Sequence, residues 1–134
     1  MCLEVIEKVF LNPTDRDWKT GYKVMSKTLD GKYASLHFPS IKSMIPGVLY
    51  TDIKDIMIVL YGYWVGGHDI ELSYPTGFHI YVDKNDCFQE IGFYADKSAT
   101  IVKVKYRRMC AIGTEWNMKQ KIVVAKEMMI TKEA

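Results

Sequence analysis

The chain has 134 residues, of which 49% are hydrophobic, and a formal net charge of +2. This length suits one domain with a proper core and is short for two, so we expect a single domain over residues 1–134. The small charge argues against a general nucleic-acid binder, which needs a strong basic excess. No apolar run reaches the roughly 18 residues that span a bilayer, and the first residues do not resemble a signal peptide. We therefore expect a soluble protein of the cytoplasm.

The cysteines give no sign of a disulfide framework or a thiolate metal site. Cys2, Cys87 and Cys110 are far apart and never form Cys-x-x-Cys. Cys87 and Cys110 are expected to be small buried hydrophobes with reduced thiols. Residues 68–71 (His-Asp-Ile-Glu) include side chains that can bind metals, but no second histidine follows at helical spacing. Neither a metal nor another cofactor is expected.

The first half of the chain gives one clear element. Residues 3–11 fit either an edge strand or one short helix, and turn-forming residues follow at 12–15. Asp30-Gly31 stands between the alternating segments 21–28 and 33–38. An Asp-Gly pair in that position is a strong signal for a β-hairpin.

The middle of the chain is ambiguous. Residues 53–65 are mostly apolar and fit a helical stripe as well as a buried strand, and periodicity does not decide between them. Gly62, Gly66 and Gly67 then interrupt the pattern. Residues 68–71 are accordingly expected on a loop or a short sheet edge.

The second half alternates more regularly. Residues 77–82 read as a strand, and Asp83 after it is a suitable cap for a helix. Apolar residues then recur at helical spacings and predict an amphipathic helix: they are Cys87, Phe88, Ile91, Tyr94 and Ala95. Residues 101–107 alternate strictly, and the β-branched run at 121–130 predicts a closing strand.

Several strands around one helix predict an α+β domain: a bent, mainly antiparallel sheet with one or two short helices. A doubly wound parallel sheet is disfavoured, because the chain lacks a regular alternation of strands and long helices.

One candidate for a binding surface lies on the strand at 77–82. His79 and Tyr81 are two residues apart, so both side chains leave the same face of that strand. If the other face is core, this pair lines a surface or cleft. An imidazole and a phenol there suit recognition of a ring or a phosphate. The alternative is a partly buried, satisfied histidine beside an interface tyrosine.

A second candidate is a basic stripe on the strand at 101–107. Lys103, Lys105 and Arg107 alternate with apolar residues, and Arg108 follows. Cations about 7 Å apart on one strand face can hold phosphate oxygens through charge-assisted hydrogen bonds. No acid alternates with them. The alternative is a solvated face that keeps the sheet soluble.

Motifs of catalysis are missing from the sequence. There is no Gly-x-Ser-x-Gly, no phosphate-binding Gly-x-x-x-x-Gly-Lys, and no pair of carboxylates in a recognisable setting. No catalytic residue is assigned on this basis, and a non-enzymatic protein is favoured.

The order of the segments resembles that of small proteins encoded by bacteriophages and prophages. The resemblance runs from residue 21 to residue 130, with an initial Met-Cys-Leu as a further point of likeness. It rests on Gly-Tyr-Lys-Val at 21–24, Gly-Phe-His-Ile-Tyr at 77–81, Val-Lys-Val at 102–104, Ile-Gly-Thr at 112–114 and Val-Val-Ala-Lys-Glu-Met at 123–128. It implies a viral protein in the bacterial cytoplasm, where small phage proteins commonly bind components of host defence. It carries over no functional residue.

A second resemblance is to ADP-ribosyltransferase-type domains, which are also small and rich in strands. It implies that His79 and nearby tyrosines surround a nicotinamide dinucleotide, and that Glu127 is a late catalytic glutamate.

The leading hypothesis is a phage-encoded, non-catalytic binding protein that counters bacterial defence. It would sequester a phosphorylated or nucleotide ligand, or block a host defence protein. The alternatives are an ADP-ribosyltransferase-like enzyme that binds NAD, and a structural accessory protein of a virus. Nucleic acid is not favoured as a partner and a membrane is not expected, while the strand edges permit a homo-oligomer. The predicted ligand-binding residues are His79, Tyr81, Lys103, Lys105, Arg107 and Arg108.

Overall fold

The computed structural model describes residues 3, 5–35, 43–54, 56–65, 68–93, 98–115 and 119–134. Within them the chain is mostly β-structure with one short helix. The elements are β1 (Val5–Val9), β2 (Lys19–Lys27), β3 (Tyr33–Ser35), β4 (Leu49–Thr51), β5 (Met57–Val65), β6 (His68–Pro75), β7 (Phe78–Tyr81), the 3-10 turn η1 (Lys84–Asp86), α1 (Cys87–Phe93), β8 (Ala99–Glu115) and β9 (Gln120–Glu133).

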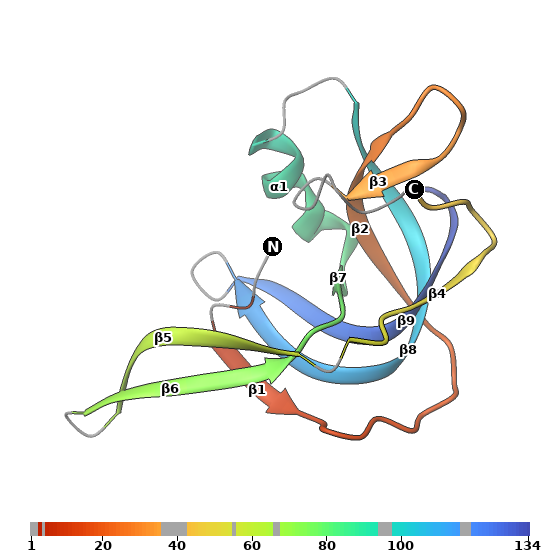
Figure 1. The fold of residues 1–134 in the computed structure, drawn as a ribbon. Helices are drawn as coiled ribbons and strands as arrows, with labels where there is room; N and C mark the ends of the chain where they lie inside the picture. Colours follow the sequence, from red (N-terminus) through yellow and green to blue (C-terminus); the bar gives the residue numbers. More distant parts are fainter. Residues whose placement is uncertain are drawn as a thin grey trace.

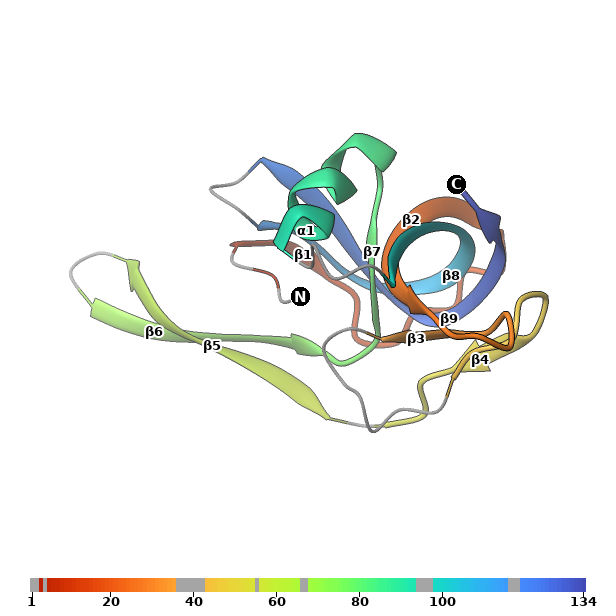
Figure 2. The same cartoon turned by 90° about the horizontal axis from the view of Figure 1, so that it is seen from above.

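The two longest strands, β8 and β9, organise the main sheet (Figure 1). They pair with each other, while β2 adds to β8 and β7 adds to β9, all antiparallel. Strands β2 and β7 also pair with each other, at Tyr22 and Tyr81. The four strands therefore close into a ring, and seen from above β2, β8 and β9 curl round one another (Figure 2). β1, β3 and β4 extend the sheet on β8, β2 and β9 respectively.

A glycine makes this closure possible. A Cβ added at Gly21 would overlap the side chain of Ile80 and would lie 2.9 Å from the carbonyl oxygen of Tyr81. Both are on β7, so the backbone of β2 passes too close to β7 for any side chain. Glycine is the residue that allows such an approach of two backbones.

Among the described residues, the core forms two clusters, one on each side of the sheet. The buried members of the first are Met25, Tyr33, Met44, Ile80, Val102, Val104, Tyr106, Val123, Ala125, Met128 and Ile130. Those of the second are Leu3, Val24, Tyr74, Tyr81, Cys87, Ile101, Cys110, Ala111, Ile122 and Val124. The second cluster lies beneath α1, which contacts β2 and β8. Successive residues of β7, Ile80 and Tyr81, belong to different clusters, so this strand is covered on both faces.

Strands β5 and β6 form a separate two-stranded sheet that projects from the body (Figures 1 and 2). The ambiguous segment 53–65 is thus a strand from Met57 onward, and residues 68–71 belong to β6 rather than to a loop. At the base of this arm Tyr74 and Pro75 are buried, and Ile58 packs against the second cluster.

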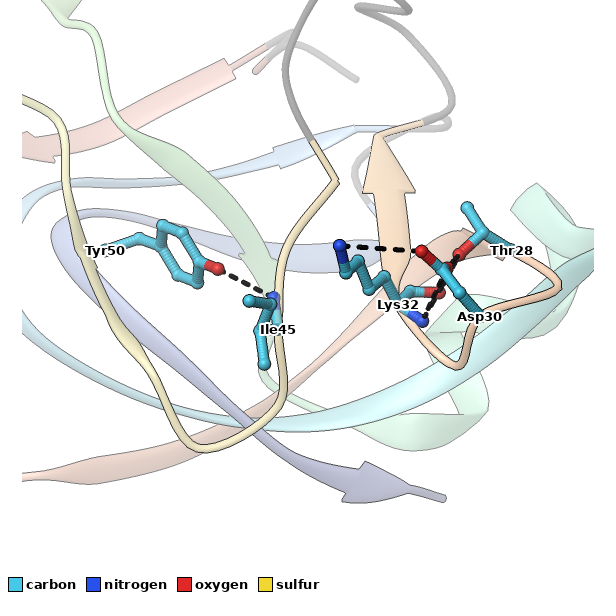
Figure 3. A network of polar contacts seen from close by, with 5 residues as sticks. All are labelled: Thr28, Asp30, Lys32, Ile45 and Tyr50. Carbon is cyan, nitrogen blue, oxygen red and sulfur yellow. Dashed lines mark hydrogen bonds and ion pairs between the residues drawn. The ribbon is translucent and has the colours of Figure 1, made fainter.

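The predicted hairpin is confirmed as β2 and β3, with residues 36–38 lying outside the described residues. Gly31 has a φ of 78°, and its amide donates to the carbonyl of Thr28. Figure 3 shows how side chains fix this turn: the Thr28 hydroxyl donates to Asp30, and the Lys32 amide donates to Thr28 Oγ1 at 3.2 Å. Beside it, the Tyr50 hydroxyl accepts a hydrogen bond from the amide of Ile45 at 2.6 Å.

The remaining expectations are met in part. The mainly antiparallel, bent sheet is confirmed, but α1 has only seven residues, so the fold is mostly β rather than a clear α+β domain. Of the two alternatives for residues 3–11, the structure has the edge strand, which is β1 at Val5–Val9. Asp83 does cap a helical turn, since its carboxylate accepts from the amide of Asn85, but the turn is η1, which leads into α1. Tyr94 and Ala95 lie outside the described residues. Among the described residues, no helix combines the length and the apolar character needed to cross a membrane.

Candidate anion-binding site

His79 and Tyr81 do not line a surface, so this expectation is wrong. Their exposed fractions are 8% and 0%. His79 Nε2 lies 3.0 Å from the hydroxyl of Tyr74, and the Tyr81 hydroxyl donates to the carboxylate of Glu115. The reason is that β7 runs between β2 and β9 with core on both faces, so neither face of the strand reaches solvent.

These two residues belong to a buried polar network beneath α1. Lys23 Nζ donates to the carbonyl of His79 at 2.7 Å, and burial lowers the pKa of Lys23. Burial also raises the pKa of Tyr81, as does its hydrogen bond to Glu115. Buried polar groups are tolerated in a core when they are hydrogen-bonded, and such bonds restrict how the core can pack. We therefore interpret this network as structural.

The cysteines behave as expected where they are described. Cys87 and Cys110 are both fully buried. Burial raises the pKa of Cys87 to about 12 and that of Cys110 to about 11, so both thiols stay protonated and unreactive at neutral pH. Cys2 lies outside the described residues. The described residues contain no group of three potential metal ligands, and the side chains of residues 68–71 are not among those described.

The basic stripe on β8 does face outward. Val102, Val104 and Tyr106 are buried, and the intervening cations are partly or fully exposed: Lys103, Lys105 and Arg107. The expectation that no acid compensates them is wrong for Arg107. Glu127 stands directly opposite on β9, and its Oε2 lies 2.5 Å from the Nε of Arg107.

Arg108 joins Arg107 on the same side because the strand is irregular there. Regular alternation would send two consecutive side chains to opposite faces. Arg108 instead has a φ of 57°, in the left-handed region, one residue before a shift in the β8–β9 register. Its amide donates to Asp15 Oδ2 at 3.1 Å, and its Nη1 lies 3.4 Å from Oε1 of Glu127. One carboxylate thus holds two neighbouring guanidinium groups.

An open hollow of about 320 Å³ lies at this point. It is lined by Pro13, Thr14, Arg16, Arg107, Arg108 and Glu127. The loop before β2 supplies one wall, and it is anchored by the bond from Arg108 Nε to the carbonyl of Pro13, 3.3 Å long. Three arginines against one glutamate give the lining a net charge of +2. Arg16 makes no ion pair with any described residue.

The electrostatics of the hollow depend on Glu127. Burial alone would raise the pKa of this carboxyl, but the hydrogen bonds and charges of Arg107 and Arg108 outweigh burial and hold the pKa below its ordinary value. Its side chain is 12% exposed. The ring of Trp18 stacks on the guanidinium of Arg107, whose Cζ lies 4.3 Å from the ring centroid.

The structure therefore joins two of the predicted site residues, Arg107 and Arg108, in one hollow. Lys103 and Lys105 lie further along β8 and are not part of its lining. Arg16 was missed because it stands in a loop, where no periodic pattern marks a residue as belonging to a site. A register prediction for β8 and β9 would have been needed to find Glu127 as the partner of Arg107.

Comparison with protein-family models, with curated proteins and with solved structures finds no match for this chain. The contacts give no support to the site implied by the ADP-ribosyltransferase resemblance. His79 is buried against Tyr74, whereas Glu127 is engaged by the arginines at the hollow.

Proposed function

We propose that this chain is a non-catalytic binding protein, encoded by a phage and acting in the bacterial cytoplasm. It holds a phosphorylated or nucleotide ligand in the hollow formed by Arg16, Arg107 and Arg108, and by sequestering that ligand it counters a host defence. The observation that carries the ligand-binding part is that three arginines and, among the described residues, a single glutamate line one open hollow. The phage setting rests on the sequence resemblance alone.

The chemistry of the lining suits a phosphate. Each guanidinium has five N–H donors in a rigid fork, so Arg107 and Arg108 keep donors for a ligand after bonding to Glu127. The Arg16 side chain makes no ion pair with a described residue, so its donors can serve that purpose as well. A phosphate monoester carries a charge of about −1.5 to −2 at neutral pH, which complements the net charge of the lining. The exposed Lys105 adds positive potential along β8 and favours the approach of an anion.

The test is a titration of the protein with inorganic phosphate and with linear and cyclic nucleotides. Binding is measured by calorimetry and by the fluorescence of Trp18. This tryptophan is a suitable reporter because its ring contacts Arg107. Arg16→Ala should weaken binding by about ten-fold or more, since hydrogen bonds between charged groups contribute about 1.5–3 kcal/mol each. Lys84→Ala, which removes an exposed cation of η1, is the matched control and should bind normally. Absence of binding across the panel would rule out the ligand form of the proposal.

The same surface suits an acidic patch on a host defence protein. Capture of such a partner should then be lost on charge reversal at Lys105 and Arg16 and kept on Lys84→Glu. Arg107 is a poor choice for this experiment, because reversing its charge would also break its pair with Glu127. Capture that survives both reversals would rule out this surface as the docking site.

A further inference from the structure

Glu127 is both a partner of the arginines and part of the wall of the hollow. Its Oε2 accepts from Arg107 Nε and its Oε1 accepts from Arg108 Nη1. A carboxylate offers about four lone-pair sites, so it has capacity for further donors after these two bonds. A group bound in the hollow can therefore use Glu127 as an acceptor and the arginines of the lining as donors.

We infer that the ligand is a phosphorylated compound with neighbouring hydroxyl groups, such as a sugar phosphate or a ribonucleotide. Its phosphate binds Arg16 and Arg108, and its hydroxyls donate to Glu127. This inference rests on the proposed function and specifies the ligand class. An anion without hydroxyls would set its negative charge beside that of Glu127, with no donor to offset the repulsion. A ligand with the phosphate at one end and a diol at the other can use both the donors and the acceptor of the lining.

The size of the hollow supports a small member of this class. At about 320 Å³ it stands at the lower end of the range of roughly 300–1,000 Å³ typical of small-molecule sites. One sugar phosphate or one mononucleotide suits that volume, whereas a dinucleotide exceeds it. Thr14 adds a hydroxyl to the same lining, which can donate to a phosphate oxygen or accept from a sugar.

A purely structural role for Glu127 leads to a different prediction. If it served only to tie β8 to β9 through Arg107, ligands with and without hydroxyls would bind equally. The wild-type protein alone can separate the two cases, so the test does not depend on how well a Glu127 variant folds.

The experiment compares four probes on the wild-type chain: AMP, its 2′,3′-dideoxy analogue, ribose 5-phosphate and inorganic phosphate. Loss of the diol should weaken AMP binding by at least about ten-fold, because it removes hydrogen bonds to a charged acceptor. Glu127→Gln should reduce that discrimination to less than about three-fold, while inorganic phosphate binds as well as before or more tightly, since a competing negative charge has gone. Similar affinities for AMP and ribose 5-phosphate would identify a sugar phosphate, and a marked preference for AMP would identify a nucleotide.

Equal affinity for AMP and its dideoxy analogue, with binding still dependent on Arg16, would overturn the inference and leave the proposed function intact. If none of the four probes binds, the inference is refuted, and the titration with cyclic nucleotides together with the capture experiment decides the proposed function.

Discussion

The closeness of β2 and β7 can be tested by filling the space at Gly21. In Gly21→Ala the new methyl would overlap the side chain of Ile80, and would stand 2.9 Å from the carbonyl oxygen of Tyr81 and 3.1 Å from the ring of Tyr106. The backbone contact is the decisive one, because a strand inside a closed ring cannot move aside without breaking its other pairings.

The expected cost follows from two opposing terms. Overpacking of a well-packed core typically costs about 1–3 kcal/mol, and a clash with backbone belongs at the upper end. Replacing glycine in a strand by alanine returns about 0.5–1 kcal/mol of conformational entropy. The free energy of unfolding of Gly21→Ala should therefore be about 2 kcal/mol lower than that of the wild type. For a chain of this size the melting temperature should fall by roughly 8 °C.

Urea denaturation followed by circular dichroism measures the effect, and Gly92→Ala is its control. Gly92 lies in α1, where a Cβ would meet no atom within 4 Å. The same substitution should there raise the free energy of unfolding, by up to about 1 kcal/mol, because alanine is the better helix former. If Gly21→Ala unfolds within about 0.5 kcal/mol of the wild type, an amount typical of a surface substitution, the tight crossing of β2 and β7 is refuted.

Three further predictions concern buried or paired groups. Tyr81→Phe removes the hydroxyl that donates to the Glu115 carboxylate, which is 5% exposed. The free energy of unfolding, measured in urea, should fall by about 1–3 kcal/mol. An unchanged midpoint of unfolding would contradict that hydrogen bond. Because the pKa of Glu127 is lowered in the folded chain, its stabilising effect is complete above the unfolded pKa of about 4.3 and is lost as the pH falls through the folded pKa. The stability difference between wild type and Glu127→Gln should shrink over that acid range, and a constant difference would be inconsistent with the ion pairs. Cys87 and Cys110 should resist alkylation by iodoacetamide at pH 8 in the native protein and react once it is unfolded in urea, as read peptide by peptide by mass spectrometry; rapid native labelling would show that they are accessible.

Elements with a strong local pattern were predictable from the sequence. The alternation at 101–107 identified both the core face and the exposed face of β8, and the Asp30-Gly31 turn identified the hairpin of β2 and β3. In both cases the information lies within a few neighbouring residues. The short helix was predictable too, because the spacing of Cys87, Phe88 and Ile91 matches α1. The weight of helix in the fold class was overestimated, since strands make up most of the described chain.

The site was only partly predictable, because it depends on contacts between distant segments. The sequence of the strand that carries His79 alternates like that of a strand with one solvent-exposed face. In the structure, however, other residues pack against both faces of this strand and bury it. The pairing of Arg107 with Glu127 depends on the register of β8 and β9, which the residue types alone do not fix. The left-handed backbone of Arg108 turns its side chain toward the same carboxylate. Arginine is not a residue type typical of that conformation, as glycine and asparagine are, so the sequence does not indicate it.

The position of β9 in the sheet has a consequence for how the chain is made. This strand completes the hydrogen bonding of β4, β7 and β8. A nascent chain that ends before residue 120 has none of these pairings. In such a chain β7 lacks one of its neighbours and β8 has an open edge. Such edges, rich in valine and isoleucine, can pair with other unfinished chains. In the interval between translation of β8 and emergence of β9 from the ribosome, these open edges allow aggregation to compete with folding.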